Sequence, residues 1–443
     1  MAAMKDSGIE WIGEIPEEWG TAKLGPCTYM KGRIGWQGLR FDDFVDEGPF
    51  LVTGTDFADG KVDWSRCYHI NDAKYAEDPA IHLREGDLLF TKDGTVGKLA
   101  YIDRLPGPAS LNSHLLVLRS QDGTIDGRYL FWMLQSPIFN RYKLLVQHGS
   151  VMDSISQTDM SHLIIPLPDH EEQRAIACHL DELVGTNDSA LKKAEKQIST
   201  LERYRASVIH EAVTKGLDPA APTKPSGVDW IGDIPENWST NKLKHIATRI
   251  FDGPFGSHLT GSDYSDEGIR VVRLENIRFM SFDESKESFV TAEKYRTISA
   301  HTVYPSDLIM ATFVEDGVKV CELPPSIPFA VNKSDCVGIR LLPAVDKRFV
   351  HYWLSSSKVH EYLLSQLHGA TRGRVNTEQI RGIPVLLPPL EEQRDIAAFL
   401  DRKCSAICAV LDTKRKQLDV LKARRQSLIY EYVTGKRRVS QEA

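Results

Sequence analysis

The sequence lacks the cysteine pattern of a disulfide framework or of a zinc site. Its seven cysteines are odd in number, scattered along 443 residues and never spaced as CxxC. Both kinds of site need regularly spaced cysteines, so we expect reduced thiols and no bound metal. Cys404 and Cys408 lie one helical turn apart, and we expect two buried helix residues there rather than metal ligands.

Long apolar stretches are also missing. No run of about 18 apolar residues is present that could cross a membrane. The first residues, MAAMKDSGIEW, have neither the basic start nor the apolar core of a signal peptide. We therefore expect a cytoplasmic protein. A hydrophobic content of 42% is ordinary for a globular protein, and a chain of this length fits about two to four domains.

An excess of positive charge is absent as well. The formal net charge is −7 at pH 7, whereas a protein that grips DNA alone through phosphate contacts is normally basic. The charge leaves two possibilities. Either DNA is not the ligand, or a few basic loops contact it and partner chains supply much of the phosphate contact.

What the chain does contain is a duplication along its whole length. The segment SGIEWIGEIPEEW at 7–19 returns as SGVDWIGDIPENW at 226–238, and EEQR at 171–174 returns at 391–394. A period of about 220 residues is far longer than the roughly 20 to 50 residues of a solenoid repeat. The sequence therefore predicts two copies of a domain-sized unit.

Each copy has the same plan, a globular domain followed by a long helix. Short alternating apolar runs separated by Gly, Pro and Asp predict an α/β or α+β domain. Asp169 is a candidate N-cap for the first helix, with Glu172 as its capping-box partner, and Pro389 suits the first turn of the second. The predicted segments are a first domain at 1–168, a helix at 169–215, a Pro-rich linker at 216–225, a second domain at 226–388, a helix at 389–435 and a tail at 436–443.

The two helices carry the strongest periodicity in the sequence. Apolar residues recur in alternating steps of three and four, which is typical of a coiled-coil seam. The seam, which is also the candidate partner-binding surface, includes Leu180, Val184, Leu191, Ile198 and Leu201, followed by Leu400, Ile407, Leu411, Leu418 and Leu421. Arg205 and Arg425 interrupt it at matching positions, where a long stem covers apolar surface while the charge reaches water.

A helix of about 43 residues with one narrow apolar stripe needs a partner, and the other helix is the obvious one. The order domain, helix, domain, helix then predicts an antiparallel pair. The expected fold is α+β, with two similar α/β domains joined by two long antiparallel coiled-coil helices in pseudo-twofold symmetry.

Two similar heads on a helical spacer suit a periodic ligand, and duplex DNA is the leading candidate. Cations, amides and aromatics reach phosphates and base edges. The candidate DNA-binding residues are Lys31, Arg33, Trp36, Gln37, Arg40, Lys92, Asn112, His114 and His148 in the first copy, and Phe255, Ser257, His258, Arg273, Asn332, Lys333, His368, Arg372, Arg374 and Asn376 in the second. The alternative is that their Gly-rich loops are ordinary surface turns. Residues 31–40 and 252–262 share little although the surrounding segments repeat, as expected if the heads share a fold but read different sequences.

The order and duplication of these features resemble the specificity subunit of a type I restriction-modification system. The resembling segments are WIGEIPEEW and WIGDIPENW, GDLLFTKDGTVGK at 86–98, DGPFGSHLTGSDYSDEG at 252–268 and the two EEQR helix starts, and together they span nearly the whole chain. The resemblance implies two target recognition domains that each read half of a bipartite DNA target, with helices that fix the unread gap. It also implies two methyltransferase subunits that bring S-adenosylmethionine, and restriction subunits that use ATP and Mg²⁺.

The resemblance further implies that this chain is not an enzyme and binds no cofactor. The residues agree, because no Asn-Pro-Pro-Tyr methylation motif and no FxGxG cofactor loop is present. GTVGK at 94–98 has too few residues between its glycines for a phosphate-binding loop. Two alternatives stay open: a methyltransferase or nuclease in its own right, and a protein-binding scaffold with two heads on a coiled-coil spacer.

Overall fold

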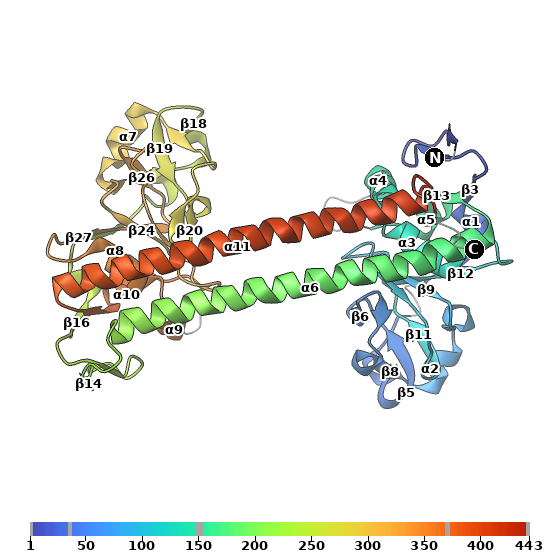
Figure 1. Cartoon of the computed structure of the whole chain (residues 1–443), viewed down its shortest axis with the longest axis horizontal. Coiled ribbons are helices and arrows are strands. Elements are labelled where there is room, and N and C mark those ends of the chain that lie inside the picture. Colours follow the sequence, from blue (N-terminus) through green and yellow to red (C-terminus); the bar gives the residue numbers. More distant parts are fainter. Residues whose placement is uncertain (1–2, 34–37, 147–153, 368–372, 440–443) are drawn as a thin grey trace. The chain divides into compact units, whose positions relative to one another are not determined.

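The computed structural model describes residues 3–33, 38–146, 154–367 and 373–439. The chain forms two compact units. Unit 1 comprises Met1–Glu195 and Lys416–Ala443, and unit 2 comprises Lys196–Arg415. The boundaries fall inside the two long helices, so each unit holds one globular domain together with half of each helix (Figure 1). In the part of the chain that the structure describes, no helix is both long and apolar enough to span a membrane.

Unit 1 is built from short strands and helices. Its strands are β1 (Met4–Asp6), β2 (Glu14–Pro16), β3 (Gly20–Lys23), β4 (Thr28–Lys31), β5 (Phe44–Val52), β6 (Phe57–Ala58), β7 (Lys61–Val62), β8 (Tyr68–Ile70), β9 (Leu88–Thr91), β10 (Leu99–Tyr101), β11 (Ala109–Leu111), β12 (Leu115–Ser120) and β13 (Ile164–Leu167). Its helices are α1 (Leu24–Cys27), α2 (Asp72–Ala76), α3 (Gly127–Leu134), α4 (Pro137–Val146), α5 (Gln157–His162) and the first part of α6 (His170–Lys215). The main sheet has the order β10-β9-β12-β4 and is antiparallel, and a three-stranded sheet has the order β11-β5-β8.

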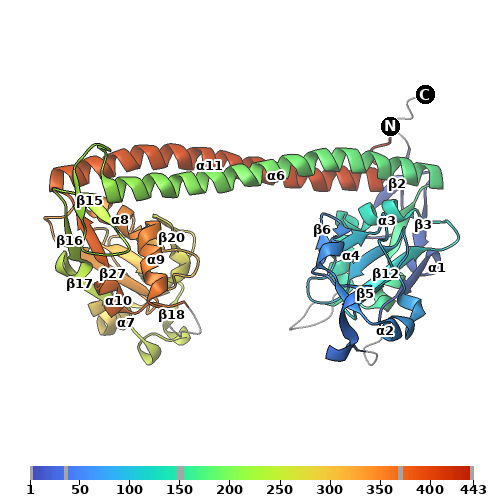
Figure 2. The same ribbon diagram turned by 90° about the horizontal axis from the view of Figure 1, so that it is seen from below.

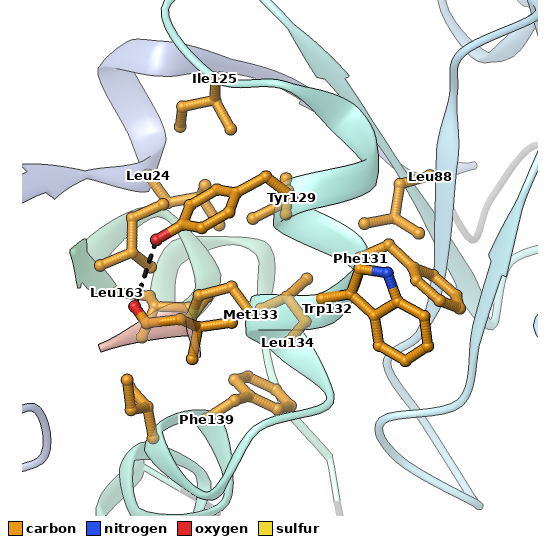
Figure 3. Close-up of a cluster of buried hydrophobic side chains, with 14 of the residues drawn as sticks. Leu24, Leu88, Ile125, Tyr129, Phe131, Trp132, Met133, Leu134, Phe139 and Leu163 are labelled. Atoms are coloured by element: carbon orange, nitrogen blue, oxygen red, sulfur yellow. Dashed lines mark hydrogen bonds between the residues drawn. The ribbon is translucent and has the colours of Figure 1, made fainter. Parts of the chain in front are cut away.

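Helix α3 lies at the centre of the unit 1 core. Asp126 caps it by accepting hydrogen bonds from the backbone N–H groups of Arg128 and Tyr129. All six residues from 129 to 134 are buried, which is the pattern of a helix covered on every side. Figure 3 shows Tyr129 and Met133 packed among side chains from other elements, including Leu163.

Unit 2 repeats this plan. Its strands are β14 (Thr223–Pro225), β15 (Asp233–Pro235), β16 (Ser239–Lys242), β17 (Ala247–Asp252), β18 (Tyr264–Ser265), β19 (Ile269–Val272), β20 (Ile277–Arg278), β21 (Ser281–Phe282), β22 (Phe289–Val290), β23 (Thr302–Val303), β24 (Leu308–Ala311), β25 (Val320–Glu322), β26 (Ala330–Asn332), β27 (Cys336–Leu341) and β28 (Pro384–Leu387). Its helices are α7 (Ala292–Ile298), α8 (Lys347–Leu354), α9 (Ser357–Ser365), α10 (Thr377–Arg381) and the first part of α11 (Leu390–Val433). The main sheet, in the order β17-β27-β24-β25, matches that of unit 1 strand for strand, while the second sheet is larger, in the order β18-β22-β19-β26-β23.

The duplicated WIG segments fasten each domain to the start of its long helix. Trp19 Nε1 donates to Glu172 at 2.8 Å in unit 1, and Trp238 Nε1 donates to Glu392 at 2.9 Å in unit 2. Asp169 caps α6 as expected, by accepting from the backbone N–H of Glu172 at 2.8 Å. The carboxylate of Glu172, expected to complete a capping box, accepts from Trp19 and pairs with Arg438 at 2.7 Å.

Helices α6 and α11 lie side by side and antiparallel within each unit (Figures 1 and 2). In unit 1, His179 from the early part of α6 contacts the hydroxyl of Tyr432 near the end of α11, at 2.9 Å. In unit 2, Glu202 from the late part of α6 pairs with Arg415 at 2.9 Å. The predicted fold class, including the duplication and the antiparallel coiled-coil pair, is confirmed.

The helix ends follow from local sequence. Gly216 comes directly after α6 and Gly435 lies just beyond α11, and both adopt positive φ angles, 75° and 68°. Such a glycine is the common C-terminal stop of a helix because it has no Cβ to clash in the left-handed region.

Candidate nucleic-acid interface

Equivalent ends of the two main sheets carry many of the predicted DNA-binding residues. In unit 1, the end of β4, the end of β9 and the start of β12 meet at one end of the sheet, since β12 pairs antiparallel with both neighbours. Lys31, Lys92 and His114 lie at these three strand ends, and the backbone N–H of Lys92 donates to the carbonyl of His114 at 2.9 Å. Asn112 Oδ1 accepts from the backbone N–H of His114 at 3.1 Å, which fixes this turn. We call this group the unit 1 sheet end.

The unit 2 sheet end is formed by the corresponding ends of β17, β24 and β27. It brings together Phe255, Lys333 and Arg374, with Arg374 paired to Asp335 at 3.1 Å. The guanidinium of Arg374 lies 6.0 Å from the ring centre of Phe255 and 5.9 Å from that of Phe313. Contacts with two aromatic rings and a carboxylate restrict the rotamers of Arg374, so its guanidinium has a preferred direction.

Several candidates at or near these sheet ends in sequence are exposed. His114 is exposed and lies 3.4 Å from Asp93. Arg40, Phe255, Ser257 and His258 are exposed, and the ring of His258 contacts the carbonyl of Phe255 at 3.2 Å. These groups are available to a ligand on the domain surface.

Two candidates are buried instead. Arg33 is only 3% exposed, and it donates to the carbonyl of Leu111 at 3.0 Å and to Ser110 at 3.3 Å. Burial lowers the pKa of Arg33 from its ordinary value. Asn332 is completely buried. The side-chain amide atoms of Asn332 have no hydrogen-bond partner among the described residues. The burial of Arg33 and Asn332 is unfavourable for the predicted direct contact with DNA.

Two further candidates make contacts within their own domain, as Arg374 does. Asn376 caps α10 by accepting from the backbone N–H of Gln379 at 2.9 Å. Arg273 pairs with Glu275 at 3.1 Å and lies over the ring of Tyr264. Five other predicted residues lie outside the described part of the chain, namely Trp36, Gln37, His148, His368 and Arg372.

An exposed aromatic group in unit 1 was not singled out from the sequence. Phe41 is 92% exposed and Tyr68 is 61% exposed, and Phe44 packs edge-on against Tyr68 with ring centres 5.6 Å apart. The signal for it was present, since Phe41 and Phe44 flank a pair of aspartates in a stretch otherwise rich in polar residues.

The predicted helix seam is buried to different degrees along its length. Leu180, Val184, Leu400, Ile407 and Leu411 are buried. The remaining members are half-buried, namely Leu191, Ile198, Leu201, Leu418 and Leu421. Leu180, Val184 and Leu400 also belong to a domain core, whereas Ile407 and Leu411 are buried near the middle of α11.

Cys404 and Cys408 differ in the same way. Cys404 is buried as expected, but Cys408 is only partly buried, so the prediction of two buried thiols is wrong for Cys408. Within the described ranges, no group of three or more His, Cys, Asp or Glu side chains is placed to hold a metal ion.

Comparison with known proteins gives a consistent family. The model of the type I restriction modification DNA specificity domain matches residues 35–200 and 284–419. A putative type I restriction enzyme MjaX specificity subunit from Methanocaldococcus jannaschii is 28% identical, over 97% of this chain and 96% of its own length. The type I restriction enzyme EcoKI specificity subunit from Escherichia coli K12 is 22% identical, over 94% of this chain and 88% of its own.

Among solved structures, a chain from a study of complex assembly and conformational transition in the type I R-M system aligns with a TM-score of 0.64. It is 16% identical in sequence, and the alignment covers 96% of this chain and 99% of that one. This likeness supports the fold.

Proposed function

Because this chain belongs to the type I restriction modification DNA specificity family, we propose that its two domains each read one half of a bipartite DNA target through their sheet ends. The chain is the sequence-specificity subunit of a restriction-modification complex and is not itself catalytic. In this proposal, the helical pair sets the unread gap and docks two methyltransferase subunits. Those partners bring S-adenosylmethionine and methylate adenine, and restriction subunits bring ATP and Mg²⁺.

The observation that carries this proposal is the convergence of three strand ends at the same place in both domains. Lys31, Lys92 and His114 in unit 1 offer cations and a ring, while Lys333 and Arg374 in unit 2 offer cations beside Phe255. Lysine and arginine position a protein on phosphates, and a guanidinium fork also recognises guanine.

The charge of the chain supports a role for partners in binding. A net charge of −7 is unfavourable for nonspecific attraction to DNA. We therefore propose that the methyltransferase subunits supply much of the phosphate contact, while the sheet ends supply the discrimination between sequences.

The test is to express the chain together with the methyltransferase subunit of the same system and to sequence the methylated positions in the host DNA. We expect one motif made of two short specified parts with an unspecified gap between them. The matched control is the methyltransferase subunit expressed alone, which should leave that motif unmodified. A complex that methylates no bipartite motif would favour a protein-binding scaffold, and methylation by this chain alone would favour an independent enzyme.

A further inference from the structure

Each unit contains a groove beside its helical pair, and the two grooves are lined at equivalent positions. The unit 1 groove has a volume of about 550 Å³ and includes Arg128, Asp181 and Arg425. The unit 2 groove has a volume of about 870 Å³ and includes Arg348 and Asp401, which lie 220 positions further along the chain, together with Arg205, the counterpart of Arg425.

One ion pair is common to both grooves. Arg128 pairs with Asp181 at 2.5 Å, and Trp132 Nε1 donates to the same carboxylate at 2.9 Å. In unit 2, Arg348 pairs with Asp401 at 2.7 Å, and the hydroxyl of Tyr352 donates to that carboxylate at 2.9 Å. The two grooves are therefore lined by equivalent positions of the duplicated sequence that make the same ion pair.

The second arginine of each groove is held differently. In unit 1, Arg425 Nε donates to Asp188 at 2.9 Å and its Nη2 donates to Gln135 at 2.8 Å. In unit 2, cysteine and serine replace these two acceptors. Arg205 Nη1 donates to the sulfur of Cys408 at 3.5 Å and its guanidinium lies 4.5 Å from the ring centre of Phe279.

The replacement leaves Arg205 without a carboxylate partner among the residues that the structure describes. The other arginines of this groove each have a carboxylate partner: Arg348 pairs with Asp401, Arg415 with Glu202 and Arg278 with Asp283. A thiol is a much weaker acceptor than a carboxylate, so Arg205 is the groove arginine that can take one further carboxylate partner.

We infer that Arg205 binds an acidic side chain of the methyltransferase subunit, and that the corresponding contact in unit 1 is blocked because Asp188 already holds Arg425. The inference rests on the proposed function, in which two identical partners dock on the two halves of this chain. Identical copies present the same acidic side chain twice. One copy meets a guanidinium that has no carboxylate partner and the other meets a guanidinium already paired with Asp188, so the two copies bind with different affinities.

The size of the difference follows from the contact. A hydrogen-bonded charge pair in a partly water-excluded groove separates the two dissociation constants by roughly tenfold. The tighter step also weakens with added salt more steeply than the other, because it contains the additional charge pair.

The experiment is a titration of the full chain with the methyltransferase subunit of the same system, followed by calorimetry and native mass spectrometry. We expect two steps with the wild-type chain. Cys408→Asp supplies the carboxylate found in unit 1, so it should weaken the tighter step roughly tenfold and make the steps equal. Asp188→Cys should strengthen the weaker step, and the uncharged control Cys408→Ser should leave the two steps apart.

Alkylation of Cys408 gives an independent readout. Cys404 serves as an internal reference, because burial raises the pKa of its thiol to about 11 and keeps it protonated. Mass spectrometry should show that the methyltransferase subunit protects Cys408 of the intact chain from iodoacetamide, and that inorganic phosphate does not.

The outcomes separate this inference from the proposed function. Two bound copies whose affinity ratio is unchanged by Cys408→Asp would overturn the inference alone. Protection of Cys408 by phosphate and not by the methyltransferase would assign the groove to a small anion and overturn it as well. A wild-type chain that binds no methyltransferase at all would contradict the proposed function, and this inference with it.

Discussion

The two units share their internal framework and differ in what they present to the outside. Trp19 with Glu172 and Trp238 with Glu392 make the same hydrogen bond at nearly the same length. Gln173 Oε1 accepts from the backbone N–H of Asp126 at 2.8 Å in unit 1, and the corresponding bond in unit 2 is 2.9 Å long. Such contacts join a domain to its long helix, so they are needed whatever the domain binds.

The sheet ends show the opposite behaviour. In unit 1, Lys31, Lys92 and His114 gather at the sheet end, and no cation–ring contact is found for them among the described residues. In unit 2, Arg374 lies near the rings of both Phe255 and Phe313. The comparison teaches that one fold carries two different surfaces. A protein that reads two unlike half-sites requires two such surfaces. Substitutions in the shared framework should affect both units alike, and substitutions at a sheet end should affect only one.

The largest expected effect is on the shared framework. Trp238 is 1% exposed, and truncation of a buried tryptophan costs about 3–5 kcal/mol. We expect Trp238→Ala and Trp19→Ala to lower the free energy of unfolding by similar amounts, each measured by urea denaturation of the intact chain.

The matched control for this prediction is Glu392→Gln. It keeps an oxygen acceptor for Trp238 Nε1 while removing the charge and the oxygen that accepts from Asn237, so its cost should still be much smaller. Strongly unequal losses from the two tryptophan substitutions would show that the framework is not equivalent in the two units.

The next largest effect is on the sequence preference of one domain, and it comes from substitutions at one sheet end. Arg374→Ala should relax the sequence preference in one half of the target and leave the other half unchanged, since discrimination by one good arginine contact is about 1–3 kcal/mol. Lys92→Ala should weaken binding through the other domain. Methylome sequencing of cells that carry each variant with the methyltransferase subunit measures both effects. Loss of preference in both halves from a single substitution would mean that the sheet ends do not act separately.

The contacts that join each domain to its helix could largely be predicted from the sequence, whereas the residues exposed on the domain surface could not. The seam residues, the antiparallel helices and the Asp169 cap follow from local periodicity and capping, which depend on neighbours in the chain. The burial of Arg33 depends on Leu111 and Ser110, nearly 80 residues away. Its role could not be inferred from a Gly-rich basic loop, because that pattern does not specify which distant carbonyls receive the guanidinium.

The groove residues illustrate the same limit. Both arginines that interrupt the seam were visible in the sequence, and each was expected to reach water from a covered stem. The difference between them arises from Asp188 and Gln135 on one side and from Cys408 on the other. These partners come from the opposite helix and from the domain, so only the assembled structure identifies them.

The smallest expected effect is a pH dependence confined to unit 2. Burial, followed by the nearby Lys358 and Lys215, lowers the pKa of His210, whose counterpart in unit 1 is Tyr430. Because the pKa of His210 is lower in the folded state, the unfolded state binds a proton more readily. The free energy of unfolding of unit 2 should therefore fall as the pH drops below the pKa of an unfolded histidine, about 6.5. Amide exchange in unit 2 at pH 7 and pH 5.5 measures this loss, and His210→Phe should remove it. Equal changes in unit 1 would contradict the assignment to His210.

The most direct test of the central claim, that the helical pair sets the gap between two half-sites, is to lengthen both helices by one heptad. Seven residues inserted after Glu195 and seven after Arg415 preserve the seam and add about 10 Å of helix, or roughly three base pairs of duplex. Methylome sequencing should then show the same two half-sites separated by a gap about three base pairs longer. The same half-sites at the original spacing would contradict the account.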